Sequence, residues 1–225
     1  MESSKKKIRT FQSLILTWFK RNGRKFQWRL PALSEYEIVI SEVLLQRTKA
    51  DTVSKFYNHF LTQYPDWSSL ATGNLNDIEQ HLIPLGLYRQ RAKRLQNLAL
   101  FMENNHQGMP AERKVLEAMP LMGQYIANAV ELLIHKKNKP LLDVNMSRVL
   151  ERYFGARKLK DIRYDPYLQK LAHEIVNHSK SKEINWAILD FAAIICQSRK
   201  PKCDVCIFQS TCQYYLIVKE MRFNN

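Results

Sequence analysis

The chain has 225 residues, 45% of them hydrophobic, which is enough to bury the core of one large or two small domains. Its net charge of +14 favours a polyanionic partner such as nucleic acid, because positive charge attracts phosphate and supplies salt-dependent affinity. No apolar run approaches the length of a membrane span. The charged start, MESSKKK, does not resemble a secretory signal, so we expect a reducing, cytoplasmic setting close to the nucleoid.

Apolar residues recur at three- and four-residue spacing, which predicts an almost entirely helical, all-α protein. Glycine occurs only 6 times, and no strong β-hairpin dipeptide is present. We expect helices over residues 8–20, 35–48, 50–63 and 75–83, a basic helix from residue 90, and further helices over 113–118, 124–135 and through 145–149.

A tight connection, Met119 to Gly123, separates the helices expected at 113–118 and 124–135. Two helices joined in this way can direct backbone N–H groups and the positive end of the second helix at a phosphate. An ordinary helix–helix connection fits the same pattern, so the spacing alone leaves both interpretations open.

All four cysteines lie in one 17-residue window near the carboxyl terminus, separated by six, two and five residues: Cys196, Cys203, Cys206 and Cys212. Four thiolates in one loop suit an iron–sulfur cluster or a tetrahedral zinc ion. Zinc sites usually pair two short-spaced cysteine knuckles, and this chain has one. Disulfides are rare in a reducing compartment. The spacing therefore favours the cluster over zinc, and zinc over disulfides.

The hairpin, the aspartate twenty residues after Gly123 and the cysteine spacing together resemble the endonuclease III superfamily of DNA glycosylases. The resemblance runs from about residue 26 to residue 215. It implies two helical lobes flanking a DNA-binding cleft, and a [4Fe–4S] cluster held by the four cysteines. One lobe is a six-helix barrel over 30–137 with the helix–hairpin–helix near 113–135. The other joins residues 1–29 to 138–225 and carries the cluster loop, 196–212.

Three parts of the sequence narrow the resemblance, and together they are most similar to the archaeal thymine–guanine mismatch glycosylases. Residues 41–48 resemble the segment that holds the catalytic glutamate of mismatch-specific adenine glycosylases, and residues 142–145 resemble their Asp-x-Asn. Tyr125 stands where bifunctional endonuclease III relatives carry a lysine, and archaeal thymine–guanine mismatch glycosylases carry tyrosine there. The hairpin departs from the family pattern because Leu121 replaces its first glycine.

The resemblance implies four catalytic positions. Asp143 stabilises the positive charge that develops on the sugar, and Asn145 orients it. Glu42, in an apolar segment, exchanges protons with the base or with water. Tyr125 cannot form an imine, so we expect a monofunctional enzyme. Taken alone, Asp143 is better interpreted as a helix cap. Asn145 could equally satisfy a helix start, Glu42 could be a solvated helix residue, and Tyr125 could pack in the core.

Further positions are expected to contact DNA. Arg47 and Leu87 match the two positions that fill the gap left by the extruded base, and Gly123 with Gln124 belongs to the hairpin. Four basic side chains are candidate phosphate contacts, although each could be a solvated charge: Arg89, Arg91, Lys200 and Lys202.

The function expected from these residues is that of a monomeric DNA glycosylase that removes thymine or uracil mispaired with guanine from double-stranded DNA. An adenine glycosylase acting on A·G or A·8-oxoguanine pairs is the alternative. Its relatives carry a further carboxyl-terminal domain, which is not expected here because the sequence ends 13 residues after Cys212. A glycosylase for a modified base and a non-catalytic DNA-binding module remain open.

Overall fold

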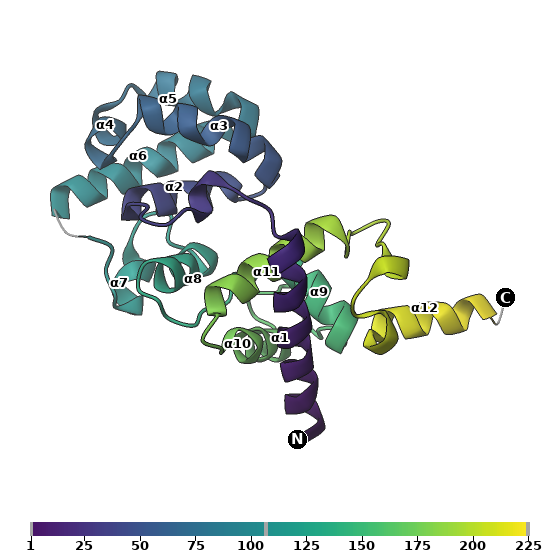
Figure 1. Ribbon diagram of the computed structural model, residues 1–225. Helices are drawn as coiled ribbons and strands as arrows, with labels where there is room; N and C mark the ends of the chain where they lie inside the picture. Colours follow the sequence, from purple (N-terminus) through teal and green to yellow (C-terminus); the bar gives the residue numbers. More distant parts are fainter. Residues whose placement is uncertain (1, 106–107, 224–225) are drawn as a thin grey trace. The chain divides into compact units, whose positions relative to one another are not determined.

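The computed structural model describes residues 2–105 and 108–223. Every regular element within these ranges is a helix, which confirms the expected all-α fold (Figure 1). The chain divides into two compact units: residues 25–136 form a continuous unit, and residues 1–24 with 137–225 form a discontinuous one. None of the helices in the described ranges is both long and apolar enough to cross a membrane.

The continuous unit is organised around α6 (Tyr88–Asn105), which packs against α4 and α5 (Figure 1). Its core contains fully buried side chains from most of its helices, among them Phe60 and Leu95. Its other elements are η1 (Gln27–Arg29), α2 (Glu35–Leu45), α3 (Ala50–Gln63), α4 (Trp67–Thr72), α5 (Leu75–Leu82), η2 (Ile83–Leu85), α7 (Arg113–Ala118) and α8 (Gln124–Leu133).

The discontinuous unit joins the amino-terminal helix to residues 137–225. Phe11 on α1 stacks on Phe208, with ring centroids 4.7 Å apart, and α1 packs against α11. The buried carboxylate of Asp190 accepts hydrogen bonds from the backbone and guanidinium of Arg24, at 2.8 and 2.9 Å. The elements are α1 (Glu2–Asn22), α9 (Val144–Phe154), α10 (Pro166–Val176), α11 (Ser181–Ile194), η3 (Cys203–Val205), η4 (Gln209–Thr211) and α12 (Gln213–Phe223).

Several helices begin where short polar side chains satisfy backbone N–H groups that have no partner within the helix. Ser34 and Glu37 form a reciprocal capping box at the start of α2. Asp143 caps α9, and Asp165 caps α10 with a proline at the first helical position. Local sequence therefore fixes the starts of the helices that position the candidate site.

The structure corrects two expectations about helices in the continuous unit. Helix α2 ends at Leu45 rather than Thr48, because Gln46 is extended, with ψ 116°, and Arg47 after it is left-handed, with φ 57°. A short helix that the periodicity did not indicate, α4, follows the Asp66 cap. Helix α4 has only 6 residues, which is too few for a helical period to be visible in the sequence.

Candidate active site

Asp143 is held by three hydrogen bonds at the start of α9. Its Oδ1 accepts from the backbone N–H groups of Asn145 and Met146, at 2.9 and 2.8 Å. Its Oδ2 accepts from the side-chain amide of Asn145 at 2.6 Å. These donors all favour an ionised carboxylate in one orientation. Asn145 therefore has the contact that its expected orienting role requires.

Burial nevertheless raises the pKa of Asp143 above the ordinary aspartate value, and this outweighs the hydrogen bonds to Met146 and Asn145 and the nearby charge of Arg148, which lower it. The helix-capping aspartates Asp66 and Asp165 behave differently, because their hydrogen bonds dominate and lower the pKa. Asp143 is thus a capping aspartate whose charged form is disfavoured by its surroundings. A perturbed acid of this kind is typical of functional sites.

Arg148 joins the Asp143 cap to the cysteine loop, a link that sequence reasoning missed. Its Nη2 donates to Asn145 Oδ1 at 3.2 Å, and its Nε donates to the backbone carbonyl of Cys196 at 2.9 Å. Arg148 lies three residues after Asn145 on α9, which is the spacing at which helical side chains meet. That spacing was a usable signal for the Asn145 contact, whereas the Cys196 contact spans 48 residues.

Glu42 and Tyr125 lie in the continuous unit, whereas Asp143 and Asn145 lie in the discontinuous one. Glu42 is 4% exposed on α2, so it is not the solvated helix residue that its sequence position also allowed. Its charge contributes to raising the pKa of Tyr57, after burial and Glu37. Tyr125 is partly buried in the first turn of α8 and packs against the core of its unit.

Arg47 and Leu87 share an unusual backbone conformation. Both have positive φ, 57° and 51°, and both side chains are exposed, Leu87 by 52%. The exposed position of Leu87 excludes the alternative that it packs inward. Left-handed non-glycine residues of this kind carry strain and concentrate at functional turns.

Arg91 does not have the environment of a phosphate contact, which corrects the expectation from sequence. It is only 6% exposed, and its guanidinium donates to the carbonyls of Leu85 and Gln46 at 3.3 and 2.7 Å. Sequence position suggested a surface charge because Arg91 lies in a basic helix. In contrast, Arg89, Lys200 and Lys202 are exposed.

The hairpin keeps its form with Leu121 in place of glycine. Leu121 has a φ of 69°, the left-handed conformation that glycine adopts most easily, and its side chain packs against the core. Its carbonyl accepts from the N–H of Gly123 at 2.9 Å. Gly123 itself has an ordinary φ of −66° and is the N-cap residue immediately before α8. The left-handed turn therefore lies at Leu121.

An ion pair between the partly buried Arg113 and the buried Glu131 ties α7 to α8 on either side of the hairpin. Arg113 donates to Asn128 Oδ1 at 2.6 Å and to Glu131 Oε2 at 2.8 Å, and both acceptors are almost fully buried. Removing one partner of a buried pair leaves an uncompensated charge, which is strongly destabilising. The hairpin is therefore presented by a pair of helices that are fixed to one another.

The four cysteines are free thiols, each partly exposed, in a loop whose only regular structure is η3 and η4. Burial raises the pKa of Cys206 to about 11, and it also raises those of Cys203 and Cys212. A metal that binds all four as thiolates would displace these protons.

Two sulfurs already have hydrogen-bond donors. The backbone N–H of Phe208 donates to Cys206 Sγ, and Nη1 of Arg152 donates to Cys196 Sγ, both at 3.4 Å. Among the described residues, no three or more His, Cys, Asp or Glu side chains are arranged to hold a single metal ion. A [4Fe–4S] cluster needs a wider arrangement, because each cysteine sulfur binds a different iron. Four cysteine sulfurs in one loop are the kind of donor set that such a cluster takes.

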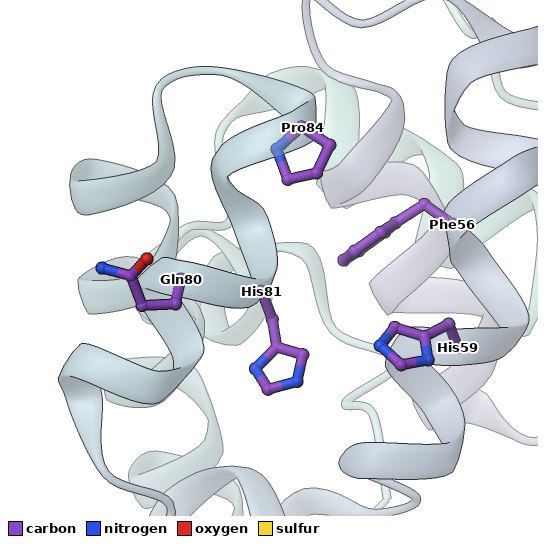
Figure 2. A pocket seen from close by; sticks show the side chains of 5 residues that line it. All are labelled: Phe56, His59, Gln80, His81 and Pro84. Carbon is purple, nitrogen blue, oxygen red and sulfur yellow. The ribbon is translucent and has the colours of Figure 1, made fainter.

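A pocket of about 340 Å³ lies elsewhere in the continuous unit. The rings of His59 and His81 face each other across it, with centroids 5.7 Å apart (Figure 2). The other lining residues are Phe56, Gln80 and Pro84. None of the candidate site residues lines this pocket, so we do not assign the expected chemistry to it.

Comparison with known proteins decides the family. Residues 40–174 match the model of the HhH-GPD superfamily of base excision DNA repair proteins. The chain belongs to this superfamily. The match begins within α2, two residues before Glu42, and ends within α10, so it includes the hairpin and Asp143.

Two relatives of this HhH-GPD protein show how the superfamily varies. The thymine/uracil-DNA glycosylase of Methanothermobacter thermautotrophicus is 35% identical over 95% of this chain and 97% of its own length. The adenine DNA glycosylase of Buchnera aphidicola (subsp. Acyrthosiphon pisum) is 30% identical over 90% of this chain but only 58% of its own length. Among solved structures, a thermostable thymine-DNA glycosylase superposes with a TM-score of 0.87, at 35% identity, covering 96% of this chain and 99% of that one.

Proposed function

We propose that this HhH-GPD protein is a base-excision-repair DNA glycosylase that removes thymine or uracil mispaired with guanine from double-stranded DNA. The observation that carries the proposal is Asp143, an oriented carboxylate whose burial disfavours its charged form. Near full-length similarity to a thymine/uracil-DNA glycosylase supports the choice of base.

The chemistry follows from the charge that base removal creates. Breaking the N-glycosidic bond sends its electron pair to the departing base and leaves positive charge on the sugar. The Asp143 carboxylate would interact more strongly with the charged sugar of the transition state than with the uncharged sugar of the bound substrate, which is the condition for a faster reaction. A water molecule then supplies the hydroxyl that ends on the sugar and the proton that ends on the base.

Glu42, Arg47 and Leu87 complete the proposed reaction. Glu42, buried on α2, would exchange a proton with the base or with water. A target base must leave the stack before it can react, and the exposed Arg47 and Leu87 would occupy the space it leaves. A guanidinium also pairs well with guanine edges, which suits a guanine partner base.

The α8 end of the hairpin is the proposed phosphate site, and Gly123 allows a clean test of it. A Cβ added at Gly123 meets nothing within 4 Å, and its φ is ordinary. We expect Gly123→Ala to change the free energy of unfolding by less than about 1 kcal/mol. Its affinity for duplex DNA should nevertheless fall about tenfold, because a methyl group keeps phosphate away from the backbone N–H groups. An unchanged affinity, measured by fluorescence anisotropy, would show that phosphate does not bind at this position.

Tyr125 supports a monofunctional reaction without strand cleavage, because a phenol cannot form an imine with the sugar. Tyr125→Lys should place an amine there and allow borohydride to trap a covalent protein–DNA adduct, visible as a shifted band on a denaturing gel. Tyr125→Phe is the matched control and should trap nothing. The absence of an adduct from a Tyr125→Lys protein that still binds DNA would show that residue 125 does not face the sugar.

We also propose that the four cysteines hold a [4Fe–4S] cluster, which would cross-link a loop that has little regular structure. The spacing of the cysteines along the sequence, the N–H donors to two sulfurs and the family membership support this assignment. The purified protein is expected to be brown, with broad visible absorbance and four irons per chain. A colourless protein with one zinc per chain would contradict it.

A single-turnover base-release assay tests the proposed function. Duplexes with central T·G, U·G, A·G and A·8-oxoguanine pairs would each be analysed with and without hot alkali. Cleavage of T·G and U·G only after alkali is the expected result. Cleavage of the adenine strand would instead favour the adenine glycosylase function, which the Buchnera relative supports as the second candidate. No base release from any of the four duplexes would favour a modified base as the substrate, or a role in DNA binding alone.

A further inference from the structure

Two turns of the continuous unit each contain one residue with a strained, left-handed backbone and an exposed side chain. The first turn follows α2 and carries Arg47, and the second lies between η2 and α6 and carries Leu87. A non-glycine residue keeps a left-handed conformation only when its surroundings over-determine it. Something in the fold must therefore hold both turns.

The side chain of Arg91 reaches both turns from α6. One nitrogen, Nη1, donates to the carbonyl of Leu85 at 3.3 Å, and the other, Nη2, donates to the carbonyl of Gln46 at 2.7 Å. Nη2 also lies 3.2 Å from the hydroxyl of Thr48. Each carbonyl is within two residues of a left-handed residue, so one buried guanidinium fixes the backbone beside Arg47 and beside Leu87.

Thr48 reinforces the same link. Its hydroxyl donates to the carbonyl of Leu85 at 3.1 Å, which joins the two turns directly. The backbone N–H of Arg91 donates to the carbonyl of Leu87 at 3.0 Å, so the residue that joins the turns also begins the hydrogen bonding of α6. Planar guanidinium donors suit this task, because several acceptors can be held in a fixed relative geometry.

We propose that Arg91, assisted by Thr48, is a positioning residue that holds Arg47 and Leu87 as one rigid pair before DNA binds. The proposal rests on the proposed function, in which this pair occupies the space left by the extruded base. Two side chains can fill one gap together only at a fixed spacing, and ordering two loose turns upon binding would cost conformational entropy. A rigid pair removes that cost from the base-extrusion step.

Amide hydrogen exchange on the free protein tests the positioning role without relying on activity. In Arg91→Met, which keeps the length of the side chain but removes the donors, the amides of residues 46–48 and 85–88 should exchange about tenfold faster. Arg91→Lys, which keeps a charged donor, should show a smaller change. Thr48→Val provides a milder disruption in case Arg91→Met folds poorly. Arg94→Met, on an exposed arginine of the same helix, is the matched control and should leave these amides unchanged.

A double-mutant cycle tests whether the link acts through Arg47 and Leu87. Arg91→Met should slow single-turnover base release from a T·G duplex at least about tenfold. In a protein that already carries Arg47→Ala and Leu87→Ala, the same change should slow release by less than about twofold, because nothing remains to be positioned. Equal losses in both backgrounds would show that Arg91 is only structural and would overturn the proposal.

The two experiments separate the proposal from the proposed function. If the wild-type protein releases no base from any mispair, the proposed function fails, and the exchange rates still decide whether Arg91 holds the turns. If the wild-type protein is active but Arg91→Met leaves the exchange of both turns unchanged, the proposed function stands and the positioning role is wrong.

Discussion

Asp143→Asn is expected to slow base release by at least about 1,000-fold, equivalent to ~4 kcal/mol of transition-state stabilisation, while duplex DNA is still bound. Asparagine keeps the shape of the side chain and an oxygen that can accept from the N–H groups of Asn145 and Met146. It loses the negative charge that, under the proposed function, stabilises the sugar in the transition state. Single-turnover kinetics and fluorescence anisotropy on the same T·G duplex measure the two effects separately.

Asp66→Asn is the matched control, because Asp66 caps α4 as Asp143 caps α9. Both changes exchange one good capping residue for another, so the free energy of unfolding should shift by less than about 1 kcal/mol in each protein. Only the Asp143 variant should lose base release. Near-normal release from Asp143→Asn would show that Asp143 is a helix cap and nothing more.

The raised pKa of Asp143 also predicts how pH acts on the enzyme. Base release should decline on acidification at a pH above the ordinary aspartate pKa of about 3.9, because the carboxylate takes up its proton there. Stability at this site moves in the opposite direction. Since the folded protein holds this proton more tightly than the unfolded chain does, protonation favours folding. As pH falls, base release should therefore decrease while the contribution of Asp143 to the free energy of unfolding increases. Kinetics and thermal unfolding measured over the same pH range can detect this difference.

Local sequence determined much of the helical structure. The helix expected at 50–63 agrees with α3, and the one expected at 113–118 agrees with α7, because each has an amphipathic pattern bounded by clear stop signals. Asp143 was recognisable as a capping residue for the same reason. Nothing in the local sequence shows, however, that burial outweighs its hydrogen bonds.

The features that sequence analysis missed depend on contacts between distant residues. The hydrogen bond from Arg91 to the Gln46 carbonyl spans 45 residues, and it accompanies the end of α2 that was expected three residues later. A basic residue in a basic helix gives no local sign that it will be buried. The link from Arg148 to Cys196 likewise appears only once α9 packs against α11. Tertiary hydrogen bonds override local propensity at these places.

Cys206→Ser is expected to abolish cluster binding and to loosen residues 196–212 while leaving the continuous unit folded. Serine cannot supply the thiolate, and the loop contains only two short 3₁₀ turns. For a site of this kind, the free energy of metal binding is part of the free energy of folding. The variant should lose its visible absorbance and bound iron, and proteolysis should cleave the loop at least about tenfold faster.

Phe208 limits how far this unfolding should spread. Its ring is 2% exposed and packs against Phe11, Tyr153 and Phe191. An anchor of this size stabilises by a few kcal/mol. The loop should therefore open locally while α1, α9 and α11 stay packed, and far-ultraviolet circular dichroism should retain most of its helical signal.

Ser198→Ala is the control within the same loop. The carbonyl of Ser198 accepts from Arg152 at 2.9 Å, and this backbone contact survives the substitution. Its iron content and proteolysis should match the wild type. Base release should fall in Cys206→Ser, since the Cys196 carbonyl holds Arg148 and Arg148 contacts Asn145 beside Asp143. A Cys206→Ser protein that keeps four irons and normal activity would show that the cysteine loop neither needs this sulfur nor supports Asp143 in its proposed role.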